Sequence, residues 1–421
     1  MITFATLLSG CAPRASVVRA PTSRSIGELL ARHAQAVLHR SSGDFVADLD
    51  PAVVDADFNR RQGAEIAALS GVPLRLWNYS VDSVVADPNA TAAASKRLGA
   101  PAIIAHVTLS YALSAVDPMP ITHALYWTFD TRDGRTYLAG DGDLADLGGP
   151  SWQGIWDFGP VVVGRGGSGL VLAHPDQAAQ VGAVTALIDE SVRRVSAVWG
   201  TDWTQQVAVL VPGSPAEFAA LTGPAAPAGP ASASLADISA ETVLEQPPGP
   251  QPAVPGVRVV LSPNALARLT PAGRSIVMTH EVTHVATAAV TNQFAPRWLI
   301  EGFADYVANL DSGQPVAAAA AELAGQVRRG ILPGELPSDA DFSATAAAGL
   351  AQTYEQAWLA CRLIAARSGA SGLARLYRLV NGAPDPAVVG VAAGLQQVLH
   401  EPPAAFVTQW RSYLRAELGR A

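Results

Sequence analysis

The sequence predicts an α+β protein with a front part, in which helices precede a curved antiparallel sheet, and a longer rear part that ends in a mostly helical half. Three observations predict this fold class. Apolar residues first recur at helical spacing, then alternate with polar residues from Leu74 to about Asp141, and later return mainly to helical spacing. The chain has 421 residues, 49% of them hydrophobic, which is enough for two or three domains.

The front part is predicted over residues 25–165. Ser25 to Leu38 has apolar residues at helical spacing behind a serine N-cap, and a shorter helix is expected from Asp50 to Leu69. The Asp133-Gly134 pair predicts a hairpin between two strands. Alternation of apolar and polar residues predicts strands in LRLWNYSVDSVV from Leu74, in AIIAHVTLSYAL from Ala102 and in THALYWTFDTRDGRTYLAGD from Thr122.

Helices followed by a long antiparallel sheet resemble the nuclear transport factor 2-like, cone-like fold, in which a curved sheet wraps helices. The resemblance covers roughly residues 25–165 and has no signature motif. Domains of this kind sometimes hold a catalytic pocket, and His106, His123 and Asp130 are the candidates to line one here. Strand histidines without a partner motif are more often ordinary sheet residues. We therefore expect the front part to be a scaffold or binding domain and not catalytic. The alternative is that it binds a small hydrophobic ligand and gates the rear part.

The rear part is predicted over residues 166–421, after a strand, glycine turn and strand within Asp157 to Leu172. Residues 166–272 should form a sheet with a backing helix, and the Pro-, Ala- and Gly-rich stretch from Gly223 to Gly256 reads as a loop, in which SLADISAETV is a candidate edge strand. The expected elements are a helix from about Gln177 to Trp199, a strand at Gln206–Val211, a short helix at Pro215–Leu221, a strand at Val257–Leu261 and a short helix at Asn264–Arg268.

Residues 273–310 carry the pattern with the most specific chemistry. His280, Glu281 and His284 form H-E-x-x-H, and residues four apart share one face of a helix. Two imidazoles suit zinc, which in a catalytic site usually takes three protein ligands and one water. Glu281 projects beside the histidines, where it can accept a proton from that water.

A second helix is expected to supply the third ligand. Pro296 ends the first segment, and a helix beginning near Trp298 carries Glu301. Asp305, one turn further on, can accept a hydrogen bond from a ligand histidine and fix its tautomer. The alternative is a helix with two half-buried histidines and a solvated glutamate, which leaves the helical spacing of Glu301 and Asp305 as a coincidence.

HEVTH followed by WLIEGFADY resembles the gluzincin metallopeptidases, and most closely the peptidase MA-like domains of actinobacterial envelope proteins. The resemblance implies a zincin-type fold, zinc bound by His280, His284 and Glu301, Glu281 as general base, and an edge strand that pairs with the substrate backbone. The gap from His284 to Glu301 is slightly shorter than in the aminopeptidase and thermolysin branches, so the type of substrate is not implied.

Residues 311–421 are predicted to be mostly helical. The resemblance assigns Tyr354 to the tyrosine that donates a hydrogen bond to the oxyanion, and the alternative is an aromatic residue packed on the core. Glu355 is expected to be a solvated carboxylate in a first helical turn, and Cys361 a buried, inert thiol. The expected helices cover Val316–Arg329, a run beginning near Thr353, Leu373–Val380, Ala387–Leu399 and Pro403–Leu418.

Composition and the N-terminus indicate where the protein acts. The net charge of −8 argues against nucleic acid and anionic membrane surfaces as partners. Cys11 ends an L-S-G-C sequence that resembles a bacterial lipobox, which implies lipidation of Cys11 and makes residues 1–24 a signal remnant and tether. The segment before it lacks Lys and Arg, unlike a complete signal peptide, and an ordinary apolar N-terminus is the alternative. No later run of eighteen apolar residues predicts a spanning helix.

The sequence therefore predicts a zinc-dependent metallopeptidase that hydrolyses peptide or protein substrates at the bacterial cell envelope. It would be an extracytoplasmic lipoprotein, held at the membrane only through a lipid at Cys11, or a secreted protein. The alternative is an envelope-tethered binding or scaffold lipoprotein with an inactive or structural zinc site. Glu281 separates the two, because a structural site has no use for a base beside an open coordination position.

Overall fold

The computed structural model describes residues 19–52, 56–223, 240–245, 256–263, 265–292, 294–342, 349–381 and 390–419. Cys11 and the lipobox lie outside the described residues. The chain divides into two compact units, one containing Met1–Gly63, Asn78–Leu109 and Ala124–Trp152, the other Ala64–Trp77, Ser110–His123 and Gln153–Ala421. The division predicted between residues 165 and 166 stays a prediction.

The front sheet is four-stranded and antiparallel, with the strands in chain order, and helices precede it. The α+β class predicted for the chain is confirmed. The elements are α1 (Ser23–His39), α2 (Ser42–Ala47), α3 (Ala56–Leu69), β1 (Leu74–Val84), α4 (Pro88–Leu98), β2 (Ala102–Leu113), β3 (Ile121–Arg132) and β4 (Arg135–Gly140).

Local chemistry explains both the agreement and the differences in this region. Asp133 and Gly134 have φ of 49° and 79°, and this two-residue turn joins β3 to β4 as predicted. The N-cap of α1 is Thr22, not Ser25 as expected, because the Thr22 hydroxyl accepts from the Ser25 amide. Helix α4 was not predicted, since its buried face consists largely of alanine and gives little apolar periodicity.

The rear sheet is mixed and has five strands in the order β5-β6-β7-β9-β8. Its three central strands run parallel, and both edge strands are antiparallel to their neighbours. The described part of the predicted edge strand SLADISAETV is confirmed, because β8 is the last strand of the sheet. The strands are β5 (Val162–Arg165), β6 (Gly169–Ala173), β7 (Val207–Val211), β8 (Ala240–Glu245) and β9 (Gly256–Leu261).

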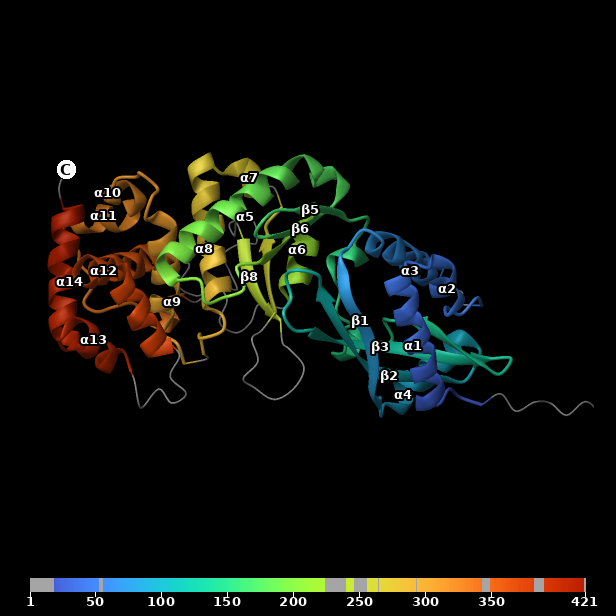
Figure 1. The fold of residues 1–421 in the computed structure, drawn as a ribbon. Helices are drawn as coiled ribbons and strands as arrows, with labels where there is room; N and C mark the ends of the chain where they lie inside the picture. The colour runs from blue at the N-terminus through green and yellow to red at the C-terminus, as the bar shows by residue number, and fades with distance from the viewer. Residues whose placement is uncertain are drawn as a thin grey trace, which may run out of the picture. The chain divides into compact units, whose positions relative to one another are not determined.

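Helices cover this sheet and then continue alone to the end of the chain (Figure 1). Val171, Val209 and Val259 of the sheet share one core with Ile188 of α5 and Val282 of α8. The helices are α5 (Ala178–Trp199), α6 (Pro215–Thr222), α7 (Ala265–Arg268), α8 (Pro271–Thr287), α9 (Arg297–Asn309), α10 (Val316–Ala319), α11 (Ala321–Arg328), α12 (Leu350–Asn381), α13 (Val391–Leu399) and α14 (Pro403–Leu418).

Helix α9 packs very closely against α12. A Cβ atom on Gly302 would lie 2.4 Å from the Ala357 carbonyl oxygen and 3.0 Å from Cys361 Sγ, so only glycine fits there. Cys361 is fully buried, as expected of an inert thiol. Element α12 consists of two helices that meet at a kink at Gly369, where φ is 76°, so the two helices predicted within residues 353–380 are present.

Two predictions for the C-terminal half are wrong. The helix expected over Val316–Arg329 is broken at Ala320, where φ is −117° and ψ is 54°. Glu355 is buried rather than solvated, because it accepts hydrogen bonds from the amides of Glu322 and Leu323 at 3.3 and 2.7 Å and so caps α11. Burial, together with Glu322, raises the pKa of Glu355 to about 8.

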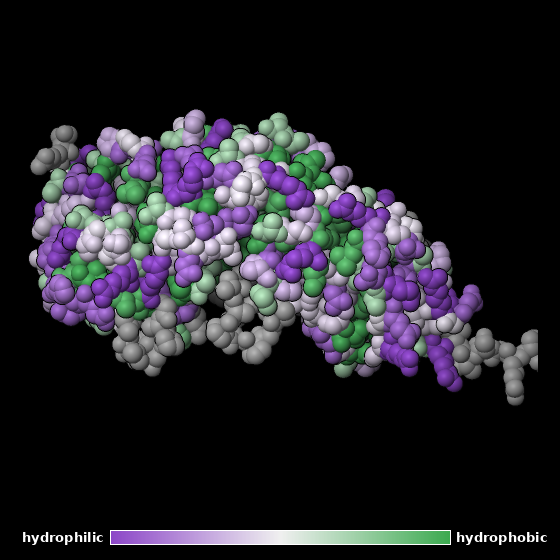
Figure 2. All heavy atoms as spheres, viewed as in Figure 1, coloured by the Kyte–Doolittle hydropathy of each residue, from purple (hydrophilic) through white to green (hydrophobic). Residues whose placement is uncertain are grey.

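Hydrophilic and hydrophobic residues are interspersed over the face of the protein drawn in Figure 2. None of the helices in the described ranges combines the length and the apolar character that crossing a membrane requires.

Candidate metal centre

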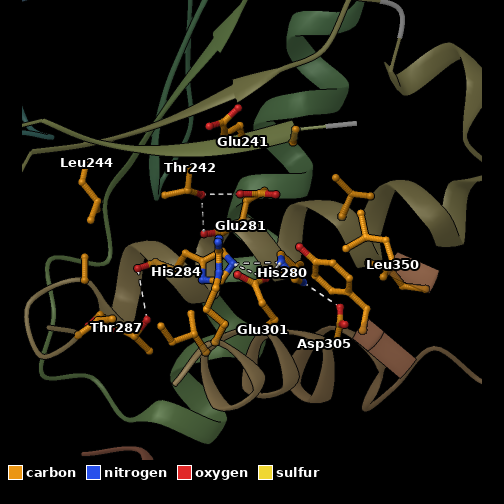
Figure 3. A pocket seen from close by; sticks show the side chains of 18 of the residues that line it. Glu241, Thr242, Leu244, His280, Glu281, His284, Thr287, Glu301, Asp305 and Leu350 are labelled. Carbon is orange, nitrogen blue, oxygen red and sulfur yellow. Dashed lines mark hydrogen bonds and ion pairs between the residues drawn. The ribbon is translucent and has the colours of Figure 1, made fainter. Parts of the chain in front are cut away.

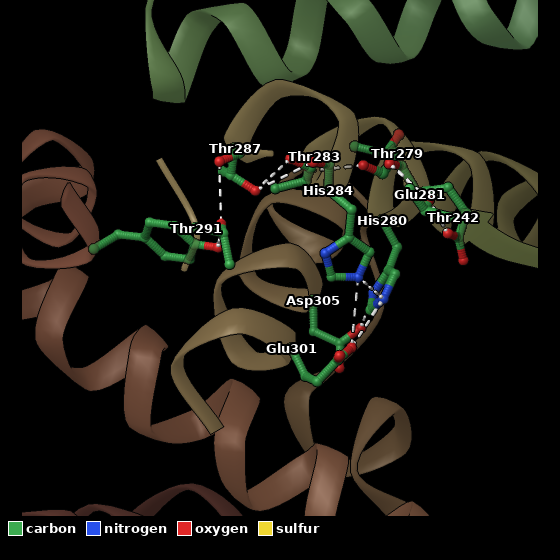
Figure 4. Close-up of polar contacts among 11 residues, drawn as sticks. Thr242, Thr279, His280, Glu281, Thr283, His284, Thr287, Thr291, Glu301 and Asp305 are labelled. Carbon is green, nitrogen blue, oxygen red and sulfur yellow. Dashed lines mark hydrogen bonds and ion pairs between the residues drawn. The ribbon is translucent and has the colours of Figure 1, made fainter. Parts of the chain in front are cut away.

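His280 and His284 of α8 and Glu301 of α9 converge on one point (Figure 4). The two Nε2 atoms are 3.0 Å apart, and Glu301 Oε2 lies 3.4 Å from that of His280 and 3.5 Å from that of His284. In the part of the chain that the structure describes, these three residues form the only such group of side chains able to hold a metal ion. The convergence predicted from the H-E-x-x-H spacing and the distant glutamate is therefore present.

The sequence of α8 holds the histidines in place. Thr270 caps the helix by accepting from the Gly273 amide, and Pro271 occupies its first turn. Met278 and Val282 are buried in the core against the rear sheet, which leaves the face with the histidines turned to a cleft. Along the helix, hydroxyls donate to the carbonyl four residues earlier at Thr283 and Thr287, and Ser191 of α5 contacts Thr279 at 3.0 Å.

Asp305 orients the first histidine. Its Oδ1 lies 2.8 Å from His280 Nδ1, which places the proton on Nδ1 and turns the lone pair of Nε2 toward His284 and Glu301. This is the arrangement predicted for Asp305.

Electrostatics at this point favour positive charge. Burial lowers the pKa of His280, but the charge of Asp305 and its hydrogen bond outweigh burial and raise that pKa well above 6.5. Burial likewise raises the pKa of Glu301, but His284 and His280 outweigh it and hold that pKa far below its usual range. Two imidazole nitrogens and an ionised carboxylate could hold a metal ion, which would displace a proton from the histidines.

Glu281 is buried beside these residues and has one close partner. The hydroxyl of Thr242 on β8 lies 2.5 Å from Glu281 Oε2 and donates to it. The same hydroxyl lies 3.4 Å from the backbone oxygen of Glu281. A single hydrogen bond from the edge strand thus orients the carboxylate predicted to be the general base. This contact was not predicted from the sequence, although the edge strand that supplies Thr242 was.

The centre opens into a cleft of about 690 Å³ (Figure 3). Residues of β8, α8, α9 and α12 line it, and much of the wall is apolar, as at Ile276, Ile300 and Leu350. Tyr354 lines the cleft and packs its ring on Phe342, with 5.3 Å between the ring centroids. The nearby negative charge of Glu301, with burial, raises the pKa of Tyr354 well above 10.0, which keeps the hydroxyl protonated and able to donate.

The histidines and aspartate considered in the front sheet do not join this group. His106 lies 3.4 Å from Asp82, and the His123 ring stacks on Tyr111 with 5.8 Å between centroids. Asp130 is buried 3.0 Å from Arg132, and burial with the charge of Asp50 raises its pKa to about 7. Each of the three residues is engaged within its own sheet, and their expected scaffold role stays a prediction.

A second histidine–carboxylate pair, not predicted, lies at the end of β6. His174 Nε2 is 2.7 Å from Glu217 Oε1 of α6, and its Nδ1 is 2.9 Å from the Pro160 carbonyl oxygen. The Gly213 amide donates to the other oxygen of Glu217 at 2.8 Å. The hydrogen bond to Glu217 raises the pKa of His174. Both ring nitrogens face acceptors, so this pair binds α6 to the sheet and offers no lone pair to a metal.

Fold and site together define an α+β protein with a His-His-Glu group, carried on two helices, that could hold a metal ion. No protein-family model and no curated protein sequence matches the chain. The gluzincin resemblance rests on the motif and on the geometry of the centre.

Proposed function

We propose that the protein is a zinc-dependent metallopeptidase of the gluzincin type. The observation that carries the proposal is the convergence of His280, His284 and Glu301 on one point at the wall of a large cleft, with Glu281 beside them as a further acid. Structural zinc sites are closed by four protein ligands, whereas this group has three and adjoins a cleft that can take a peptide.

Zinc would be held by the Nε2 atoms of both histidines and by the Glu301 carboxylate. When bound, the ion polarises a carbonyl and lowers the pKa of a water molecule to about 7. Glu281, oriented by Thr242, would accept the proton of the attacking water and later deliver it to the leaving amine. Asp305 would keep the His280 tautomer fixed throughout.

Two further features support peptide hydrolysis. Tyr354, protonated at neutral pH, would donate a hydrogen bond to the oxyanion of the tetrahedral intermediate. Strand β8 is bonded to β9 on one side only among the described strands, and residues from both of its faces line the cleft. An extended peptide would add to its second side as a further strand.

The proposed location is extracytoplasmic, with a lipid on Cys11 as membrane anchor, and the proposed front domain is nuclear transport factor 2-like. These parts of the proposal rest on the sequence resemblances. The alternative is a binding or scaffold lipoprotein whose zinc is structural or inactive. That alternative shares the metal group and differs in having no turnover.

Replacement of the proposed base tests the function directly. Glu281→Gln should retain bound zinc, because Glu281 is not one of the converging ligands, and should lower peptide hydrolysis by roughly a hundredfold to ten-thousandfold. Zinc content by mass spectrometry and cleavage of a quenched fluorescent peptide library are the two measurements. The control is Glu335→Gln, the same change at an exposed residue outside the cleft, which should alter neither.

Two outcomes would contradict the proposal in different ways. Full activity of Glu281→Gln on a peptide that the wild type cleaves would remove Glu281 as the base. Zinc-loaded wild-type protein that cleaves no member of the library would favour the binding or scaffold lipoprotein.

A further inference from the structure

Glu241 on β8 differs from the other acidic side chains of the cleft. Glu281 accepts from Thr242, Glu301 faces the two histidines, and Asp305 is paired with His280. Glu241 lines the same cleft and is half-buried, and its carboxylate has neither a hydrogen bond nor an ion pair to any described residue.

The surroundings of Glu241 make its charge costly. Burial, and then the nearby negative charge of Glu281, raise the pKa of Glu241. The described lining of the cleft contains four acidic residues and one arginine, Arg297, so negative charge is in excess there. The acidic residues are Glu241, Glu281, Glu301 and Asp305. Zinc would compensate the carboxylates at the metal centre, but Glu241 is not one of the converging ligands. A cation next to Glu241 would therefore stabilise its ionised carboxylate, which no described residue of the chain does.

The register of the sheet shows where such a cation would come from. Glu241 pairs with Val260 and Thr242 with Val259, so their side chains point to opposite faces of β8. Figure 3 shows Thr242 on the side of Glu281 and Glu241 on the other side of the strand. In a peptide added to β8, the residue directly opposite Glu241 would carry its side chain on the face of Glu241, with the Cβ atoms roughly 5 Å apart.

We propose that Glu241 is a specificity-determining residue that selects substrates with a cationic group, an ammonium or a guanidinium, close to the cleaved bond. This inference rests on the proposed peptidase function and names the substrate class of that site. The cleaved bond lies close by because Thr242, the next residue, holds Glu281. Strand pairing favours a Lys or Arg side chain as the source of the cation. A free α-ammonium group has the same chemistry and is separated from it in the test.

Glutamate on an edge strand has one other established use. Charged residues on sheet edges prevent pairing with other chains and so limit aggregation. That role predicts that neutralising Glu241 promotes self-association and leaves substrate choice unaltered. The test below therefore measures both.

The experiment compares peptides that carry Lys, norleucine or Glu at each of the two positions flanking the cleaved bond, each with a free and with an acetylated N-terminus. The wild type should prefer Lys over norleucine by roughly tenfold to a hundredfold in kcat/KM, as for a hydrogen bond to a charged group. Glu241→Gln should bring this ratio close to one, and Glu241→Lys should favour Glu peptides. Glu335→Gln, an exposed control, should keep the wild-type ratio.

The outcomes separate the possible explanations. A Lys preference that survives acetylation assigns the cation to a side chain, and one that is lost on acetylation assigns it to the α-ammonium group. An unchanged Lys ratio in Glu241→Gln, with or without new self-association by light scattering, overturns the proposal.

Binding of the same peptides to Glu281→Gln, with and without Glu241→Gln, by fluorescence anisotropy gives a readout that needs no turnover. If Glu241 discriminates between charges in binding but the wild type cleaves no peptide, the proposal of cation recognition is supported and the proposed peptidase function is wrong. If the wild type cleaves peptides without discriminating between charges, the peptidase function is supported and the role proposed for Glu241 is wrong.

Discussion

Two histidine–carboxylate pairs in the rear part of the chain have nearly equal separations but differ in their capacity to bind a metal ion. His280 and Asp305 lie 2.8 Å apart, and His174 and Glu217 lie 2.7 Å apart. The second ring nitrogen of His280 points at another histidine and a carboxylate, whereas that of His174 points at a backbone carbonyl.

The second nitrogen decides what each pair can do. Both nitrogens of His174 face acceptors, and the hydrogen bond to Glu217 raises the pKa of the ring, so neither nitrogen is available to a metal. The Nδ1 proton of His280 is held by Asp305, whereas Nε2 faces His284 and Glu301, where a metal ion could displace its proton. A buried histidine beside a carboxylate is therefore a candidate metal ligand only when its other ring nitrogen faces further side chains that can bind the same ion.

The largest expected effect is on zinc binding. His280→Ala removes one of three converging ligands and should weaken zinc binding more than roughly a hundredfold, which exceeds the usual effect of losing a ligand's hydrogen-bond partner. His174→Ala should leave zinc affinity unchanged and lower the free energy of unfolding by about 1–3 kcal/mol, because Glu217 loses its partner. Competition with a fluorescent chelator and urea denaturation measure the two quantities. Loss of zinc affinity in His174→Ala would show that the two pairs are not independent.

Replacement of Asp305, the hydrogen-bond partner of His280, should have a smaller effect on zinc binding than loss of the histidine. Asp305→Ala should reduce zinc affinity or activity by roughly tenfold to a hundredfold, because the His280 tautomer is no longer fixed. Asp305→Asn should lose less, since the amide oxygen still accepts from Nδ1. Glu217→Gln is the matched control and should leave zinc affinity as it is. The same chelator assay applies, and equal affinities in Asp305→Ala and wild type would refute the orienting role.

The smallest expected effects are those of pH. A rise in pH should weaken the contribution of His174 to fold stability and strengthen zinc binding at His280. The pKa of His174 is raised above 6.5, so its pairing stabilises the fold fully below about pH 6.5, and this contribution is lost as pH rises through the raised value. At His280, protons compete with zinc, so zinc affinity should fall as pH falls through its raised pKa. Urea denaturation of metal-free wild type and Glu217→Gln across this range, beside zinc titrations, checks both signs. A stability difference that grows with pH would contradict the first.

Elements with strong local patterns were predicted well from sequence. The alternation over β1 to β4 and the Asp133-Gly134 turn predict the front sheet, and short apolar runs predict β7 and β9. Helix α4 was not predicted, because mostly alanines form its buried face and they give little apolar periodicity. Glu355 was misjudged because whether a first-turn carboxylate is solvated depends on what packs against it, here the amides of α11.

The metal ligands were predictable for a similar reason. His280 and His284 are one helical turn apart, so local periodicity brings them together. Glu301 lies on the next helix, and its place beside them was expected from the turn of the chain between the helices and from the gluzincin resemblance. Contacts between distant segments were not predictable. Thr242 lies 39 residues before Glu281, and His174 lies 43 residues before Glu217, and no local pattern links either pair.

At Gly302 the backbones of α9 and α12 lie too close for even a methyl group. The residue directly before it is Glu301, and α12 carries Tyr354, so the close packing of α9 on α12 sets how far apart these two cleft residues lie. Strand β8 lines the same cleft, and its Leu244 is half exposed. Engineering for bulkier substrates should therefore begin with Leu244 on that strand and leave α9 untouched.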